Sequence, residues 1–221
     1  MRGSNDLAKV DRAGAGFAGP RLGRARELMT VANPTLEVSD EALMQAYARG
    51  EAPAFDQLYE RHRGGSYRYF LRNLREERQA QELFQDLWMS VVRASATYEP
   101  RAKFSTWLYA MAHNRLIDHY RRAGVVELVP MDGEAGDAGA AAFPDPAPGP
   151  DREAESRQAA RQLLRLVEAL PLAQREAFLM QEEGGLSLSE IAEVTGSGLE
   201  TVKSRLRYAM TRLRQGMREF A

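Results

Sequence analysis

The sequence predicts an all-α protein with two small helical domains joined by a flexible, acidic linker rich in Pro, Gly and Ala. Apolar residues recur three and four positions apart in both halves, and no segment sustains the two-residue alternation of a strand. Residues 123–155 cannot bury a core, because Gly, Ala, Pro and Asp dominate them. We therefore expect domains at 35–122 and 156–221, the linker at 123–155, and a disordered extension or expression tag at 1–34.

Four helices are predicted in the first domain. Ser39 is a candidate N-cap for the first helix, and Gly50 is its stop signal. A second, a third and a fourth helix follow, the last from about 105 to 122. Their apolar positions fall at helical spacing: Phe55, Leu58, Tyr59, Tyr67, Phe70, Leu71 and Leu74; then Leu83, Leu87, Val91 and Ala94; then Trp107, Leu108, Met111, Leu116 and Ile117.

The second domain opens with two predicted helices. SRQAARQLLRLVEAL carries its larger apolar residues on one side, and LPLAQREAFLMQEEGG ends at Gly184–Gly185. Ser187–Leu–Ser–Glu190 and Ser197–Gly–Leu–Glu200 then have the pattern of two capping boxes, with Thr195–Gly196 between them. A short helix, a tight turn and a longer helix are typical of a helix-turn-helix.

The longer helix of this motif is amphipathic. Its apolar residues fall within a narrow arc at about 100° per residue: Leu199, Val202, Leu206, Met210 and Leu213. Basic and hydroxyl side chains, which can bond phosphates and base edges, occupy the remaining surface: Lys203, Ser204, Arg205, Arg207, Tyr208, Thr211 and Arg214. A lone basic helix is more often a solvated face, but the turn motif before it favours DNA binding.

A second candidate nucleic-acid surface lies at 98–122. Aromatic and basic residues alternate there, with five basic residues against Glu99 and Asp118, a net charge of +3. Aromatic rings beside cations suit unstacked bases in single strands. Core aromatics with solvated charges explain the same stretch equally well.

Charge and composition restrict the alternatives. The net charge of the 221-residue chain is −1, while residues 123–160 hold eight acidic and two basic residues, a net of −6. Any nucleic-acid contact must therefore come from local patches. The chain has no cysteine, which excludes disulfides and thiolate zinc sites. No apolar run approaches about 20 residues, and residues 1–30 lack the apolar segment of a secretory signal, so we expect a cytoplasmic protein without membrane insertion.

A metal site is disfavoured. His113, Asp118 and His119 could be ligands on one helix, but the spacing places Asp118 and His119 on different faces. No glutamate base is positioned as in helical zinc motifs. We expect no metal and no cofactor.

Three runs of the sequence resemble the extracytoplasmic-function (ECF) sigma factors of the bacterial RNA polymerase sigma family. They are DEALMQAYARGEAPAFDQLYERH, AQELFQDLWMSVVRASATYEPRAKFSTWLYAMAHNRLIDHYRR and LVEALPLAQREAFLMQEEGGLSLSEIAEVTGSGLETVKSRLRYAMTRLR. They cover nearly all of 39–215 except the linker. The resemblance implies a sigma region 2 domain, a region 4 domain and a non-enzymatic transcription initiation factor. It would bind core RNA polymerase and promoter DNA and would have an anti-sigma partner.

The resemblance also implies roles for matching positions. The surface that docks on the β′ clamp helices would contain Glu82, Leu83, Gln85, Asp86 and Trp88. The −10 element would be melted and read by Tyr98, Arg101, Lys103, Phe104, Ser105, Asn114, Arg115, Tyr120, Arg121 and Arg122. The −35 element would be read by Ser197, Thr201, Lys203, Ser204, Arg205, Arg207, Tyr208, Thr211 and Arg214, and region 4 would also meet the β flap.

Other functions remain as alternatives. A stand-alone helix-turn-helix transcriptional regulator would use the first domain for ligand binding or dimerisation. A metal enzyme would use the two histidines and Asp118. An adaptor without a DNA role is disfavoured by the aromatic and basic stretch at 98–122.

Overall fold

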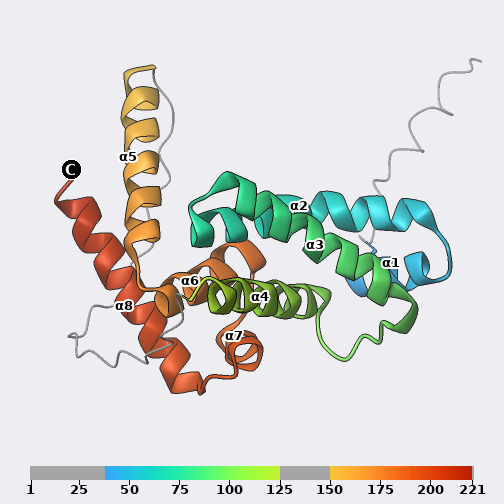
Figure 1. Cartoon of the computed structure of the whole chain (residues 1–221). Helices are drawn as coiled ribbons and strands as arrows, with labels where there is room; N and C mark the ends of the chain where they lie inside the picture. The colour runs from blue at the N-terminus through green and yellow to red at the C-terminus, as the bar shows by residue number, and fades with distance from the viewer. Residues whose placement is uncertain (1–37, 125–149, 221) are drawn as a thin grey trace, which may run out of the picture. The chain divides into compact units, whose positions relative to one another are not determined.

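The computed structural model describes residues 38–124 and 150–220, and every regular element within these ranges is helical (Figure 1). In order, the elements are α1 (Asp40–Ala48), α2 (Ala52–Leu74), α3 (Glu77–Ala94), the 3₁₀ turn η1 (Ser95–Thr97), α4 (Phe104–Arg122), α5 (Pro150–Ala169), α6 (Leu172–Gly184), α7 (Leu188–Thr195) and α8 (Leu199–Arg218). The all-α prediction is confirmed. The predicted extension at 1–34 and most of the predicted linker lie outside the described residues, and α5 begins five residues before the predicted end of that linker.

Local signals place most helix ends where the sequence predicts them. The Ser39 side chain accepts a hydrogen bond from the Ala42 amide at 3.2 Å at the start of α1. Gly185 and Gly196 end α6 and α7 in the left-handed conformation, with φ of 63° and 62°. One prediction is wrong: Ser197 does not cap α8, because Gly198 takes the N-cap position. The Ser197 hydroxyl instead accepts a hydrogen bond from Arg205 at 2.8 Å.

The first half of the described chain, residues 38–124, buries its core between α2, α3 and α4. Tyr69, Phe70, Leu87 and Leu108 are fully buried there. Beside them, Phe55, Tyr59, Phe84 and Trp88 form an aromatic cluster in which the Trp88 ring lies 4.9 Å from Tyr59 and 5.8 Å from Phe55, both edge-on. These contacts join α2 firmly to α3.

In the second half, residues 150–220, helix α8 packs against α5, α6 and α7 through the predicted apolar arc. Val202, Leu206 and Leu213 are buried, as expected, and Met210 is half-buried. Leu199 is the exception, with 43 % of its surface exposed, because it lies in the first turn of α8, beyond the reach of the neighbouring helices. The apolar pattern therefore identifies the core face, except at the end of the helix.

The two halves also contact one another directly. Helix α2 packs on α6, and α4 packs on both α6 and α7. Residues from Val38 onward accordingly group into a single compact unit. The sequence did not predict this contact.

Candidate nucleic-acid interface

The helix-turn-helix prediction is confirmed in α7 and α8. Glu190 and Ser187 form a reciprocal capping box: the Ser187 amide donates to Glu190 Oε2 at 2.8 Å, and the Glu190 amide donates to Ser187 Oγ at 3.4 Å. The Ser187 hydroxyl and amide hydrogen bonds lower the pKa of Glu190 to about 2. Glu190 is therefore a carboxylate at neutral pH and holds the start of α7 rigidly before the Gly196 turn.

The face of α8 opposite the core carries the predicted basic residues. Lys203 and Arg207 are exposed, and the other predicted side chains on this helix are half-buried: Thr201, Ser204, Arg205, Tyr208, Thr211 and Arg214. Some of these groups already have partners. Lys203 Nζ lies 2.7 Å from Glu200 Oε1, and the Arg207 guanidinium lies 5.3 Å from the centre of the Tyr208 ring. Because the Glu200 pair is exposed, phosphate can replace the carboxylate at little cost.

A cavity of about 670 Å³ lies where the η1–α4 loop meets α7. Three predicted −10 residues line it: Tyr98, Arg101 and Asn114. Five more lining residues fall in the predicted 98–122 stretch but were not assigned to the −10 set: Glu99, Ala102, Thr106, Trp107 and Ala110. The sequence missed the other four: Ala94, Thr97, Glu193 and Val194. An aromatic wall beside an arginine and an amide suits a planar base, which stacks on rings and bonds through its edges.

The predicted −10 residues at the start of α4 and just before it differ in how deeply they are buried. Phe104 is fully buried, and its ring packs 5.7 Å from Trp107 and 6.3 Å from Tyr98, so it supports the cavity wall from behind. Lys103 is exposed and pairs with Glu190 of α7 at 3.1 Å, while Ser105 is half-buried. Burial, followed by the neighbouring Glu41, raises the pKa of Tyr98 to about 12, so its hydroxyl stays protonated.

The predicted −10 residues near the C-terminal end of α4 lie away from the cavity. Arg115 bonds the Ser90 hydroxyl, and Tyr120 donates to the Asn73 carbonyl at 2.7 Å. Arg121 pairs with Asp118 at 2.9 Å, and Arg122 is exposed. The predicted set therefore divides into a cavity group and a separate basic helix end.

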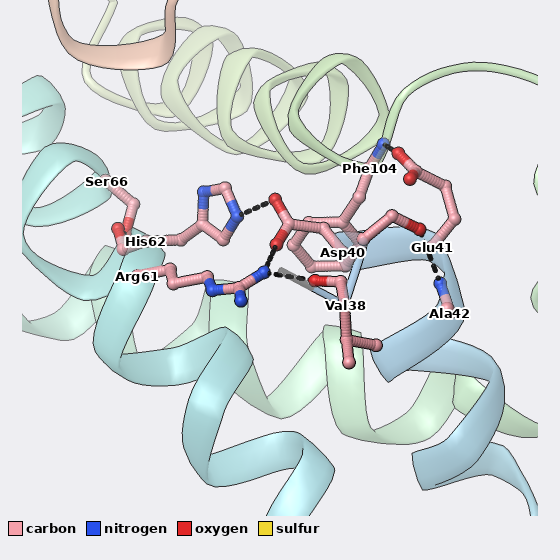
Figure 2. A network of polar contacts seen from close by, with 9 residues as sticks. Val38, Asp40, Glu41, Ala42, Arg61, His62, Ser66 and Phe104 are labelled. Carbon is pink, nitrogen blue, oxygen red and sulfur yellow. Dashed lines mark hydrogen bonds and ion pairs between the residues drawn. The ribbon is translucent and has the colours of Figure 1, made fainter. Parts of the chain in front are cut away.

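A polar network of residues from α1 and α2 holds the start of α4 (Figure 2). The Phe104 amide donates to Glu41 Oε1 at 2.7 Å, which satisfies one orphan amide of the helix end. The neighbouring Asp40 accepts from Arg61 at 2.7 Å and lies 2.6 Å from His62 Nε2. The His62 hydrogen bond is the largest cause that lowers the pKa of Asp40. These bonds join α1 both to α2 and to the start of α4, at the end of the loop between η1 and α4.

The predicted docking residues on α3 are not equally accessible. Glu82, Gln85 and Asp86 are exposed, and Leu83 is half-buried. Trp88 is only 5 % exposed and belongs to the aromatic cluster of the core. Met89, which the sequence analysis did not single out, is 52 % exposed beside this surface. The sequence could not show that Met89 is a surface residue, because this depends on which side of α3 is buried.

The three residues considered as metal ligands have other partners. His113 lies 2.8 Å from Glu176, Asp118 pairs with Arg121, and the His119 ring packs edge-on against Tyr120. Within 38–124 and 150–220, no three His, Asp or Glu side chains converge so that they could hold a metal ion. In the same ranges, no helix has the length and apolar character needed to cross a membrane.

Comparisons with known proteins match both halves of the chain to one family of proteins. Family models described as Sigma-70 region 2 and Sigma-70, region 4 match residues 58–125 and 160–213. The ECF RNA polymerase sigma factor SigM of Mycobacterium tuberculosis is 30% identical over 177 residues, which span 80% of this chain and 84% of SigM. The ECF RNA polymerase sigma factor RpoE of Cereibacter sphaeroides is 34% identical over 179 residues, which span 80% of this chain and 93% of RpoE.

The fold is also found in solved structures. The structure of CnrH in complex with the cytosolic domain of CnrY aligns with a TM-score of 0.58 at 20% identity, covering 82% of this chain and 99% of CnrH. The structure of RpoE in complex with the anti-sigma factor NepR from Bartonella quintana aligns with a TM-score of 0.55 at 21% identity, covering 74% of this chain and 96% of RpoE.

Proposed function

This chain belongs to the ECF RNA polymerase sigma factors, and we propose that it recruits core RNA polymerase to promoters through separate −10 and −35 surfaces. The region 2 domain at 35–122 carries the −10 surface, and the region 4 domain at 156–221 carries the −35 surface. A single observation supports both roles: one chain holds a helix-turn-helix with an exposed basic face and an aromatic cavity suited to an unstacked base. A stand-alone regulator needs only the first of these features.

The −35 element is bound by α8 in the major groove. Exposed Lys203 and Arg207 lie one helical turn apart, so both reach the same stretch of duplex. Arg207 is suited to a bidentate contact with guanine, while Ser197, Thr201 and Arg214 are placed for phosphate contacts that set the register.

The −10 element is bound as a single strand. A base that leaves the stack enters the cavity, stacks on Trp107 or Tyr98, and bonds through the Asn114 amide and the Arg101 guanidinium. The exposed Arg121 and Arg122 near the end of α4 bind the flanking phosphates. No bond is made or broken in this process, so the protein acts by binding and not by catalysis.

Core polymerase is bound mainly through α3. Glu82, Gln85 and Asp86 form an exposed polar and acidic surface for the β′ clamp helices, and Met89 adds an apolar contact. Region 4 contacts the β flap. An anti-sigma factor is the expected inhibitory partner, since the structurally similar Bartonella quintana RpoE was solved with one. These activities belong in the bacterial cytoplasm.

Reconstituted transcription tests the proposal. Core polymerase with and without this chain is incubated on a library of genomic fragments, and the transcripts are sequenced. Promoter-specific starts that require the chain, with shared motifs upstream, are expected. Specific binding of duplex by the chain alone, without any effect on transcription by core polymerase, would instead support the stand-alone regulator.

A further inference from the structure

We infer that Met89 on α3 is a reversible oxidation site, and that conversion of its thioether to a sulfoxide weakens the binding of core RNA polymerase. This inference rests on the proposed function, because it takes the exposed side of α3 as the surface that binds core polymerase. It adds a chemical control to that surface. The oxidant is a peroxide, and the reduced thioether is the binding form.

Exposure distinguishes Met89 from the other methionines that the structure describes. Met89 is 52 % exposed, whereas Met44 and Met180 are fully buried. The remaining methionines of the described ranges are half-buried: Met111, Met210 and Met217. A peroxide must reach the sulfur to oxidise it, so reactivity follows exposure. Within 38–124 and 150–220, Met89 is therefore the methionine that reacts first.

Met89 lies on the side of α3 that faces away from the core. Leu87 and Val91, two positions before and after it, are fully buried. Two positions along a helix correspond to a rotation of about 200°, so the Met89 side chain points away from both. A change in the chemistry of this side chain consequently leaves the packing of the core intact.

Polar and charged side chains surround Met89 on the same face of α3. Gln85 and Asp86 lie one turn before it and Arg93 one turn after it, and all three are exposed. Glu82 lies one further turn back, with 60 % of its side chain exposed. An apolar centre with a polar rim is the usual arrangement of a protein–protein interface, and residues at the centre contribute most of the binding free energy. A change in the polarity of Met89 therefore acts where binding is most sensitive.

The oxidation step needs only the thioether and hydrogen peroxide. A lone pair of the Met89 sulfur attacks one peroxide oxygen, the S–O bond forms, the O–O bond breaks, and the second oxygen leaves as water with both peroxide protons. The sulfur is oxidised by two electrons and the peroxide is reduced. Methionine sulfoxide reductases return two electrons and two protons and release the oxygen as water. The chain has no cysteine, so no thiol within it competes for the oxidant.

The sulfoxide opposes binding through its polarity. Methionine contributes a flexible apolar contact, and oxidation places a strongly polar oxygen on its sulfur. When α3 docks on a partner, this oxygen loses its water, and burial of a polar group without a new hydrogen bond is unfavourable. We therefore expect oxidised Met89 to weaken binding of core polymerase by about tenfold.

The test treats the full chain with hydrogen peroxide, removes the peroxide with catalase, and then adds core polymerase in a fluorescence titration. Trypsin releases QAQELFQDLWMSVVR, residues 79–93, in which Met89 is the one methionine. Fragment ions in mass spectrometry separate oxidation of Met89 from oxidation of the adjacent Trp88. We expect Met89 to be converted before Met217, the affinity for core polymerase to fall about tenfold, and methionine sulfoxide reductases to restore it. Bound core polymerase should slow the conversion of Met89.

Three variants assign the effect to this residue. Met89→Leu cannot form a sulfoxide, so its affinity should be the same before and after peroxide treatment. Met217→Leu is the matched control, because it keeps Met89 and should lose as much affinity as the wild type. Met89→Gln carries a polar group of similar length and should bind core polymerase about tenfold more weakly than Met89→Leu without any peroxide. Equal circular dichroism of all three would show that folding is not the cause.

The inference is wrong if Met89 is fully converted and the affinity for core polymerase stays the same. It is also wrong if Met89→Leu loses affinity on peroxide treatment as the wild type does, since the sensitive group then lies elsewhere in the chain. Both results leave the proposed function intact, provided that the untreated chain binds core polymerase and directs promoter-specific transcription. An untreated chain that does neither would refute the proposed function and the inference with it.

Discussion

Asp40→Asn should destabilise the first half of the protein, and the loss should depend on pH. Asp40 uses both carboxylate oxygens: Oδ1 accepts from Arg61 at 2.7 Å, and Oδ2 lies 2.6 Å from His62 Nε2. Arg61 also donates to the Val38 carbonyl at 2.7 Å, so the carboxylate fixes the start of α1 on α2. Asparagine keeps one acceptor oxygen but presents an NH₂ group to the second donor.

The magnitude follows from the partial burial of the group. A hydrogen bond to a charged group contributes about 1.5–3 kcal/mol when it is well shielded. The Asp40 and Arg61 side chains are 24% and 33% exposed, so solvent weakens these bonds. One bond is lost and the other loses its charge, and we therefore expect the free energy of unfolding to fall by about 1–2 kcal/mol at pH 7.

The sign of the pH effect follows from the direction of the pKa shift. Folding lowers the pKa of Asp40 below its ordinary value of 3.8, chiefly through the His62 hydrogen bond. The carboxylate therefore stabilises the fold fully above that value and loses its contribution as the pH falls through the folded-state pKa. The difference between wild type and Asp40→Asn should be largest near neutral pH and should shrink in acid.

Urea unfolding monitored by tryptophan fluorescence measures this difference. The chain has two tryptophans, Trp88 and Trp107, and both lie in the first half, so the signal reports that half. Asp56→Asn, an exposed carboxyl on α2, is the matched control and should change nothing. An unchanged midpoint for Asp40→Asn at pH 7 would refute the reasoning, as would a deficit that persists undiminished below pH 3.

Four further substitutions test the helix-turn-helix and the docking surface. Asp86→Arg should weaken binding to core polymerase by about tenfold or more because it reverses a charge on the exposed side of α3, and unchanged fluorescence titration with core would exclude this surface. Arg207→Ala should cost about 1–3 kcal/mol at the cognate −35 sequence and reduce discrimination among variants, whereas Arg214→Ala should weaken all sequences equally and lower the salt slope by about one. Equal, sequence-blind losses from both would limit α8 to phosphate contacts. Glu190→Ala should destabilise α7 by about 1 kcal/mol at pH 7. Because folding lowers the pKa of Glu190 to about 2, this deficit should disappear between pH 4.5 and 2 in an acid titration of the circular dichroism.

Signals that act within a few residues were readable from the sequence. The Ser187 capping box and the Gly196 turn form from groups that are neighbours in the chain, so their residue types are sufficient to predict them. The wrong prediction that Ser197 caps α8 also involves residues that are close together in the sequence. Gly198 takes the N-cap position, and the Ser197 hydroxyl instead accepts a hydrogen bond from Arg205, about two turns into α8.

Burial within an aromatic-rich helix was less predictable. Trp88 and Phe104 fall in the stretches that resemble polymerase-binding and DNA-binding surfaces, yet both side chains are in the core. Periodicity defines an apolar face about 100° wide, but which rings at its border turn inward depends on the space left by α1 and α2. Leu199 shows the opposite case, because a core-face residue is exposed where its helix extends beyond its neighbours.

The sequence alone was sufficient to predict the helices, the helix-turn-helix, the acidic stretch between the two halves and the family resemblance. Each of these depends on short-range pattern and composition. Only the tertiary structure brought Glu193 and Val194 to the cavity of Tyr98 and Trp107, and Glu176 to Tyr69, across about a hundred residues of chain. Gly65 is a residue whose role needs both the sequence and the tertiary structure to be understood. Its presence inside a helix was visible in the sequence, but its reason lies in the carbonyl of Glu183, which only the packing of α6 on α2 places against it.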